Sequence, residues 1–200
     1  VIHFYHLQAL DWVNVVNASK ADPAKAAALG ASLSDWPLNS VGAMTAVKDQ
    51  LNRLLASGQL SIFSNGYWDH PDYRLPPEAD LMAVAHYLQA LDWQRDMIKV
   101  HTIFGGKNPH PNFLVGGMAS AINMDNQWTI NQVRLDVIAA LVEQCAVFVE
   151  QVYLPDVLAI ASYYKDYFEI GAANPNLMAT GLPGYAGGGP PAQGGFAPGV

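Results

Sequence analysis

The chain has 200 residues, a hydrophobic fraction of 51%, a charged fraction of 14% and a formal net charge of −7. The negative charge and the lack of a basic cluster exclude a typical nucleic-acid-binding protein. The single cysteine, Cys145, excludes an internal disulfide framework. No signal peptide is visible, and no uninterrupted apolar stretch is long enough to span a bilayer. We expect much of this weakly charged, apolar surface to be covered by a partner or by more of the same protein.

The first third of the chain carries three helical patterns. Apolar periodicity predicts a helix over residues 2–18, and Asp22 followed by Pro23 predicts the start of a second helix that runs to about Leu33. Ser40 is the expected N-cap of a third helix, which Gly58 should stop. Weak alternation over residues 60–63 suggests a short strand, and the aromatic, Gly- and Pro-containing residues 65–77 read as a loop.

The longest predicted helix begins at Pro77 and continues to Gly105 without a break, as a bundle spine would. Two short extended runs are expected within residues 113–130. A last long helix is expected from about Asn131 to Phe168, with a kink or a break where Pro155 removes a backbone donor.

The fold class that follows is mainly α, a long-helix bundle with a few short strands. Residues 1–170 form the helical part, and residues 171–200 form a segment dominated by Gly, Pro and Ala that reads as loop. The chain opens on Val1 rather than Met, inside a helical pattern without a cap. We therefore expect a processed product or an excerpt of a longer sequence.

The segment from Gly105 to Asn112 (GGKNPHPN) places two glycines, two prolines, a lysine and a histidine directly after the longest helix. Glycine accepts the left-handed conformation that ends a helix, and each proline fixes its own φ and restricts the residue before it. A stiff loop of this kind would hold His110 in a defined place. On spacing alone we favour the simpler interpretation, a rigid connection with an incidental histidine.

The other candidate residues have plain structural explanations. His3 and His6 are three residues apart on a helix and could both bind a metal, but no Glu or Cys nearby supplies a third ligand. His86 and His101 lie within the longest helix, and Cys145 lies in an apolar helix that should bury its thiol. Spacing alone therefore indicates a helical scaffold with no complete catalytic or metal site.

Several segments, in order along nearly the full chain, are similar to the large subunits of nickel–iron hydrogenases. Their sequences most resemble the membrane-bound uptake type. They are His3-Phe4-Tyr5-His6-Leu7, Ala9-Leu10-Asp11-Trp12, Gly58-Gln59-Leu60, Asn65-Gly66-Tyr67-Trp68, Leu75-Pro76-Pro77-Glu78, Ala85-His86-Tyr87-Leu88, Phe104 to Asn112, and Gln151-Val152-Tyr153-Leu154-Pro155-Asp156.

The resemblance implies a specific chemistry for the parent protein. The family's large subunit carries a nickel–iron centre with CO and cyanide on iron, held by two CxxC pairs, and it oxidises H2 reversibly to protons and electrons. This chain has one cysteine and no CxxC, and it lacks the acidic residue that the family places just before the HFYHL segment. The resemblance therefore implies a central part of a larger large-subunit fold, with both ligand pairs outside it.

The resemblance also implies partners and a place for the loop. Electrons would pass to an iron–sulfur small subunit, and a membrane cytochrome b-type subunit would hold the complex at the periplasmic face of the membrane. His110 would lie at the subunit interface near the electron path, with Lys107 and Asn108 as supporting contacts, and His3 and His6 would pack nearer the active-site side. The alternatives are a non-catalytic helical scaffold that has lost its metal ligands and an unrelated helical interaction module.

Overall fold

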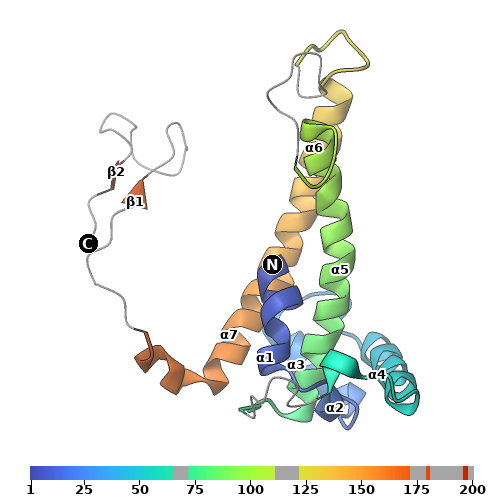
Figure 1. Ribbon diagram of the computed structural model, residues 1–200, viewed down its shortest axis with the longest axis vertical. Coiled ribbons are helices and arrows are strands. Elements are labelled where there is room, and N and C mark those ends of the chain that lie inside the picture. The colour runs from blue at the N-terminus through green and yellow to red at the C-terminus, as the bar shows by residue number, and fades with distance from the viewer. Residues whose placement is uncertain (65–71, 111–121, 172–178, 181–195, 198–200) are drawn as a thin grey trace. The chain divides into compact units, whose positions relative to one another are not determined.

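The computed structural model describes residues 1–64, 72–110, 122–171, 179–180 and 196–197. The chain divides into two compact units, Val1–Tyr163 and Tyr164–Val200. The first unit is helical, which confirms the mainly α prediction. In it the long helices α5 (Pro77–Gly105) and α6 (Gln132–Phe148) run side by side, while the shorter helices gather around the end where α5 begins (Figure 1). The domain boundary expected near residue 170 stays a prediction.

The N-terminal segment is not the single helix predicted over residues 2–18. It forms a π-helical turn η1 (His3–Gln8), then α1 (Ala9–Trp12), and after a break the short helix α2 (Val15–Ala18). Val13 is extended at the break, and the side chain of Asn14 accepts a hydrogen bond from the backbone N–H of Asn17. Asn14 therefore restarts the helix as an N-cap, a competing local role that apolar periodicity does not reveal.

The next two helices begin where their capping residues predict. In α3 (Pro23–Leu33) the carboxylate of Asp22 accepts from the N–H of Ala24, and in α4 (Val41–Ala56) the hydroxyl of Ser40 accepts from the N–H of Ala43. The strand expected over residues 60–63 is wrong, because the chain forms a single 3₁₀ turn η2 (Ser61–Phe63). An isolated strand would leave its ladder groups unpaired, whereas the turn satisfies part of its backbone locally.

Helix α5 ends as its sequence indicates. Gly106 follows it in the left-handed conformation with φ 76°, and its N–H donates to the carbonyl of Thr102. The first part of α5, from Ala79 to His86, is buried on all sides. That burial makes α5 the spine around which η1, α2, α3, α4 and α6 pack.

The last long helix is continuous through its proline but changes pitch. Helix α6 leads into a π-helical turn η3 (Val149–Tyr153), and α7 (Leu154–Tyr163) follows. Pro155 has no N–H to donate to the carbonyl four residues earlier. The wider π-helical turn η3 lies directly before it, where that hydrogen bond would be missing. The helical run ends at Tyr163 rather than near Phe168, and residues Lys165–Glu169 form a separate 3₁₀ helix η4 in the second unit.

By length and composition alone, the run Gln132–Tyr163 is apolar enough to cross a membrane, since an 18-residue stretch within it has a mean hydropathy of 1.6. Glu143 and Glu150 interrupt it, and its end is joined to the rest of the first unit by buried polar contacts of Asp156. A single helix of this kind is weak evidence of a membrane span, because helices of protein cores have the same composition.

An aromatic core joins three elements of the first unit. Tyr5, Ala90, Phe148 and Val152 are buried together, and Phe148 makes edge-on ring contacts with Tyr5 and Trp36. The core thus packs η1 against α5 and against the junction of α6 with η3.

The described strands are short. In the second unit β1 (Ala179–Thr180) pairs antiparallel with β2 (Phe196–Ala197). Of the two extended runs expected within residues 113–130, the part up to residue 121 lies outside the described residues, and Ile122 and Ile130 form an isolated parallel bridge.

Candidate functional site

The loop after α5 keeps its predicted site residues at the surface. Lys107, Asn108 and His110 are all exposed. His110 has φ 60°, in the left-handed region that few residues other than glycine adopt. Histidine is among the residues that tolerate this conformation, so the chain can turn sharply here while keeping an imidazole in water.

The loop is tied back to α5 by one side-chain contact. The ring nitrogen Nδ1 of His101 lies 2.6 Å from Oδ1 of Asn108. Since Oδ1 can only accept, His101 donates from Nδ1. His101, expected to be structural, therefore helps to fix the start of the loop that carries His110.

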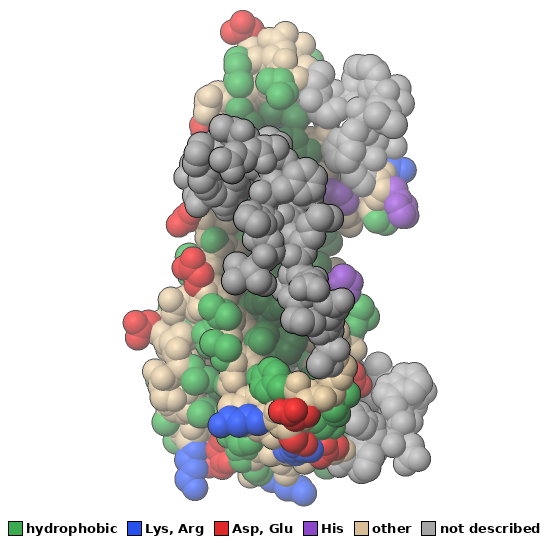
Figure 2. All heavy atoms as spheres, turned by 90° about the vertical axis from the view of Figure 1, so that its left-hand side faces the viewer, with side chains coloured by type: hydrophobic (Ala, Val, Ile, Leu, Met, Phe, Trp, Pro, Cys, Tyr) green, Lys and Arg blue, Asp and Glu red, His purple; other side chains and the backbone are tan. Residues whose placement is uncertain are grey.

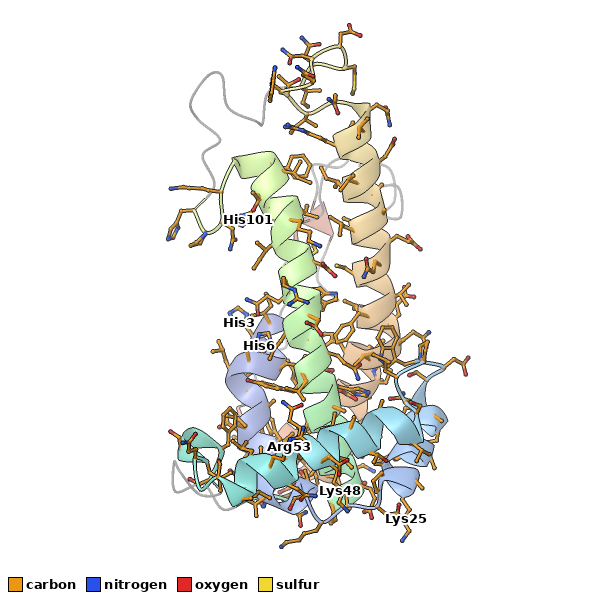
Figure 3. All side chains as sticks on the ribbon, turned by 90° about the vertical axis from the view of Figure 1, so that its right-hand side faces the viewer. His3, His6, Lys25, Lys48, Arg53 and His101 are labelled. Carbon is orange, nitrogen blue, oxygen red and sulfur yellow. The ribbon has the colours of Figure 1, made fainter. Side chains whose placement is uncertain are left out.

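An apolar cleft of about 480 Å³ lies along α5 below this loop. Its lining includes Ile2 of the N-terminal segment, Met97, Ile98 and Phe104 of α5, and Asn108 of the loop. Figure 3 shows His3, His6 and His101 on this side of the molecule. The structure thus brings the two predicted groups, the N-terminal histidines and the loop, to neighbouring parts of one face.

His3 and His6 do not form a metal site with other described residues. His3 is exposed, while His6 is half-buried with its ring edge-on to Tyr87 and its Nε2 without a hydrogen-bond partner. Burial lowers the pKa of His6, and the nearby N-terminal amine of Val1 lowers it further. Within the described ranges, no group of three or more His, Cys, Asp and Glu side chains is arranged to hold a metal ion.

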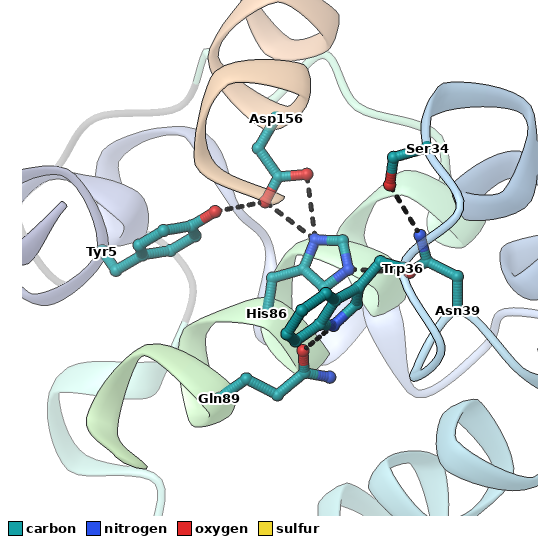
Figure 4. Close-up of polar contacts among 7 residues, drawn as sticks. All are labelled: Tyr5, Ser34, Trp36, Asn39, His86, Gln89 and Asp156. Carbon is teal, nitrogen blue, oxygen red and sulfur yellow. Dashed lines mark hydrogen bonds and ion pairs between the residues drawn. The ribbon is translucent and has the colours of Figure 1, made fainter. Parts of the chain in front are cut away.

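A buried polar network occupies the centre of the first unit (Figure 4). The hydroxyl of Tyr5 on η1 donates to Oδ2 of Asp156 on α7 at 2.6 Å. The ring Nδ1 of His86 on α5 lies 2.9 Å from both carboxylate oxygens of Asp156. All three side chains are almost completely buried, with exposures of 1%, 0% and 2% for Tyr5, Asp156 and His86. Burial, and after it the neighbouring carboxylate, raise the pKa of the Tyr5 hydroxyl far above its usual value.

The network extends to the loop between α3 and α4. Oδ1 of Asn39 lies 2.8 Å from Nε2 of His86, and Nδ2 of Asn39 donates to the hydroxyl of Ser34. Beside it, the indole N–H of Trp36 donates to Oε1 of Gln89 at 2.7 Å (Figure 4). Segments far apart in sequence are thus joined by polar contacts in the interior, where such contacts are strongest.

A second buried acid lies near the start of α5. Asp80 is 0% exposed and accepts from the backbone N–H of Asn14 and from the amide of Asn17. Burial raises the pKa of Asp80 to about 7, against the lowering effect of these two hydrogen bonds. Asp80 therefore holds α2 on α5, and its ionisation near neutral pH has a cost for the fold.

Sequence reasoning missed both buried acids and Asn39. His86 was expected to be structural, which agrees with its burial, but its partner Asp156 is 70 residues away along the chain. An available signal was that Asp80 and Asp156 each stand within an apolar helical stretch, where an unpaired carboxylate would be costly. Cys145 is buried as predicted, and burial raises the pKa of its thiol, with Asp96 adding to the shift.

The chain is similar to known proteins over almost its whole length. The model of a family described as nickel-dependent hydrogenase matches residues 1–188. The uptake hydrogenase large subunit of Rhizobium leguminosarum bv. viciae is 51% identical over 185 residues, 90% of this chain and 31% of that protein. The uptake hydrogenase large subunit of Rhodobacter capsulatus is 52% identical over 171 residues, which cover 84% of this chain and 29% of that protein.

The hydrogenase-1 large chain of Escherichia coli strain K12 is 49% identical over 174 residues, which cover 86% of this chain and 29% of the relative. The chain thus spans less than a third of the length of these relatives. The described residues contain one thiol, which is buried, so they do not fit a nickel–iron centre held by cysteine thiolates.

Proposed function

Because the chain belongs to the nickel-dependent hydrogenase family, we propose that it is part of a catalytic large subunit that oxidises H2 reversibly to protons and electrons. The observation that carries this proposal is the identity of about 50% to hydrogenase large subunits over most of the chain. We propose the uptake type, because the similar proteins from Rhizobium and Rhodobacter are uptake hydrogenase large subunits.

The nickel–iron centre of the parent protein, with CO and cyanide on iron, would be held by cysteines beyond these 200 residues. Two observations support this: the one thiol here is buried in α6, and the relatives are more than three times as long as the matched region. The role of this segment would be to form a helical scaffold beside the metal centre, with no metal ligand and no catalytic residue of its own.

The exposed loop after α5 would contact an iron–sulfur small subunit. The support is local: His110, Lys107 and Asn108 are solvent-exposed, and the tie between His101 and Asn108 fixes the start of the loop. An imidazole at such a boundary can donate or accept a hydrogen bond and can carry charge near an electron path. His3 and His6 would lie toward the active-site side of the scaffold.

The complex would associate with a membrane on its periplasmic face through the small subunit and a cytochrome b-type subunit. The uptake type of the relatives supports the membrane association; the periplasmic face and the cytochrome b-type subunit rest on the resemblance alone. The helical run Gln132–Tyr163 is not needed for it, because part of that run contributes Asp156 to the buried network.

The test is H2-dependent reduction of a viologen dye by the full-length protein, produced with its small subunit and its maturation machinery. The proposal expects dye reduction under H2 and none under argon. A correctly assembled complex that binds no nickel and reduces no dye would instead support the alternative, a non-catalytic helical scaffold or interaction module.

A further inference from the structure

Both ring nitrogens of the buried His86 face hydrogen-bond acceptors. Nδ1 lies 2.9 Å from each oxygen of Asp156, and Nε2 lies 2.8 Å from Oδ1 of Asn39. A neutral imidazole has one N–H and one lone pair. In this arrangement a neutral ring would therefore turn a lone pair toward an oxygen on one side, and His86 is only 2% exposed to solvent that could relieve the repulsion.

Two arrangements with a neutral imidazole ring would avoid that repulsion. In the first, the amide of Asn39 rotates so that its NH2 group donates to Nε2. This leaves a net negative charge on Asp156, which is 0% exposed and forms no ion pair with a lysine or arginine of the described residues. An uncompensated carboxylate in the interior is much more costly than a neutral pair.

In the second arrangement Asp156 takes the proton and donates it to Nδ1. Nδ1 lies equally far, 2.9 Å, from both oxygens of Asp156, as a ring N–H facing an ionised carboxylate would, whereas an acid O–H would sit on one oxygen alone. The carboxylate also accepts from the Tyr5 hydroxyl at 2.6 Å, a short bond of the kind that a charged acceptor forms. Both observations favour an ionised Asp156 beside a protonated ring.

We propose that His86 is held as an imidazolium ion, and that its ion pair with Asp156 positions Tyr5 and, through Tyr5, the π-helical turn that carries His3 and His6. The groups that contact this pair come from two surrounding segments: Tyr5 from η1 and Asn39 from the loop between α3 and α4. Tyr153 of η3 lies next to Tyr5, with ring centroids 6.3 Å apart. The buried triad of Tyr5, His86 and Asp156 is neutral overall in this state.

The protonation state is read directly by nitrogen NMR of the full chain labelled with ¹⁵N-histidine at neutral pH. The signals of His86 are assigned by their loss in His86→Gln. Both ring nitrogens should resonate in the range of protonated nitrogens. If either resonates as an unprotonated nitrogen, the imidazolium assignment is wrong. Solid-state spectra give the same shifts if the chain associates.

The positioning role is read by amide hydrogen exchange in η1. Tyr5→Phe removes one hydroxyl and keeps the ring, and it should speed exchange in η1 by roughly tenfold or more while His86 stays doubly protonated. Asp156→Asn should speed the same exchange and also remove one proton from the ring. Unchanged exchange in η1 for Tyr5→Phe would overturn the positioning role.

Gln89→Leu is the matched control. It breaks the hydrogen bond to Trp36, which is of similar length and lies one turn along α5 but outside the triad. Exchange in η1 and the His86 signals should be as in the unaltered chain. If Gln89→Leu changes them as much as Tyr5→Phe does, the effect is general loosening of α5 and the positioning role is wrong.

Discussion

At the scale of single residues, the titratable side chains fall into a buried kind and an exposed kind. Those in the interior, His86, Asp156 and Asp80, have their hydrogen-bonding groups matched by partners from other elements. Those at the surface, above all His110, have none of this packing and stand on a loop of restricted backbone. The first kind explains the fold, and the second kind is available for a partner.

Asp80 should make the protein less stable as the pH rises from about 4 to about 7. Burial raises its pKa in the folded chain to about 7 from 3.8, so above pH 4 the unfolded chain ionises freely while the folded chain keeps the proton. The folded state therefore binds more protons, and its free energy of unfolding falls until the folded carboxyl also ionises. In urea unfolding across this pH range, the free energy of unfolding of Asp80→Asn should fall less with rising pH than that of the unaltered protein. An identical pH dependence in the two proteins would rule out Asp80 as its source.

His110→Ala should leave the nickel content of the assembled full-length enzyme near normal. The exposed imidazole is proposed to act at the subunit boundary, so its loss should slow electron transfer to the dye or weaken small-subunit pairing. Nickel analysis, dye reduction under H2 and co-purification of the small subunit measure the three effects. A variant that loses nickel would contradict the interface role. Lys25→Ala is the control, because Lys25 is an exposed residue of α3 outside the loop, and it should have none of these effects.

At the scale of elements, helix α3 and the buried triad are coupled through one close approach. Gly30 of α3 is buried, and a Cβ added there would lie 2.6 Å from Cγ and 2.7 Å from Oδ1 of Asn39. The Asn39 side chain cannot move away freely, because its amide group is hydrogen-bonded to both His86 and Ser34. The absence of a side chain at position 30 is therefore what lets the loop between α3 and α4 reach α5.

Gly30→Ala should lower the free energy of unfolding by about 1–3 kcal/mol, in spite of the better helix propensity of alanine. Gly42→Ala is the control, since a Cβ at position 42 of α4 meets nothing within 4 Å. That variant should be neutral or more stable by up to about 1 kcal/mol. Chemical denaturation compares the two, and equal stabilities for both variants would show that the contact with Asn39 carries no weight.

The elements that could be predicted are those fixed by local chemistry. Asp22–Pro23, Ser40 and Gly106 end or begin helices through contacts within one turn, so their positions can be read along the chain. The break at Asn14 depends on a hydrogen bond to the distant Asp80. The pairing of His86 with Asp156 joins residues 70 positions apart. No periodicity reports such contacts. The composition of the chain indicates the exposed loop, but the interface role proposed for it rests only on the resemblance.

At the scale of the whole molecule, the surface is unusually apolar for a chain that stands alone. Large hydrophobic side chains are exposed along α6 and beyond it, and Figure 2 shows them between scattered charges on one face. Exposed examples are Val133, Trp128 and Phe168 at 71%, 75% and 72%. In the parent protein such surfaces would be covered by other parts of the assembly.

The isolated chain should therefore associate or stay poorly soluble. Sedimentation velocity at several protein concentrations should show species larger than one chain, growing with concentration. A chain that stays a monodisperse monomer at every concentration would contradict the view of this chain as a scaffold that needs the remainder of a large subunit.

We propose that this chain supplies the scaffold of a nickel–iron enzyme and none of its metal ligands. Nickel analysis of two proteins matured side by side tests it most directly: the isolated 200-residue chain and the full-length large subunit. We expect nickel in near-stoichiometric amount in the full-length protein and none above background in the isolated chain. Stoichiometric nickel bound to the isolated chain, or none in a correctly assembled full-length protein, would contradict it.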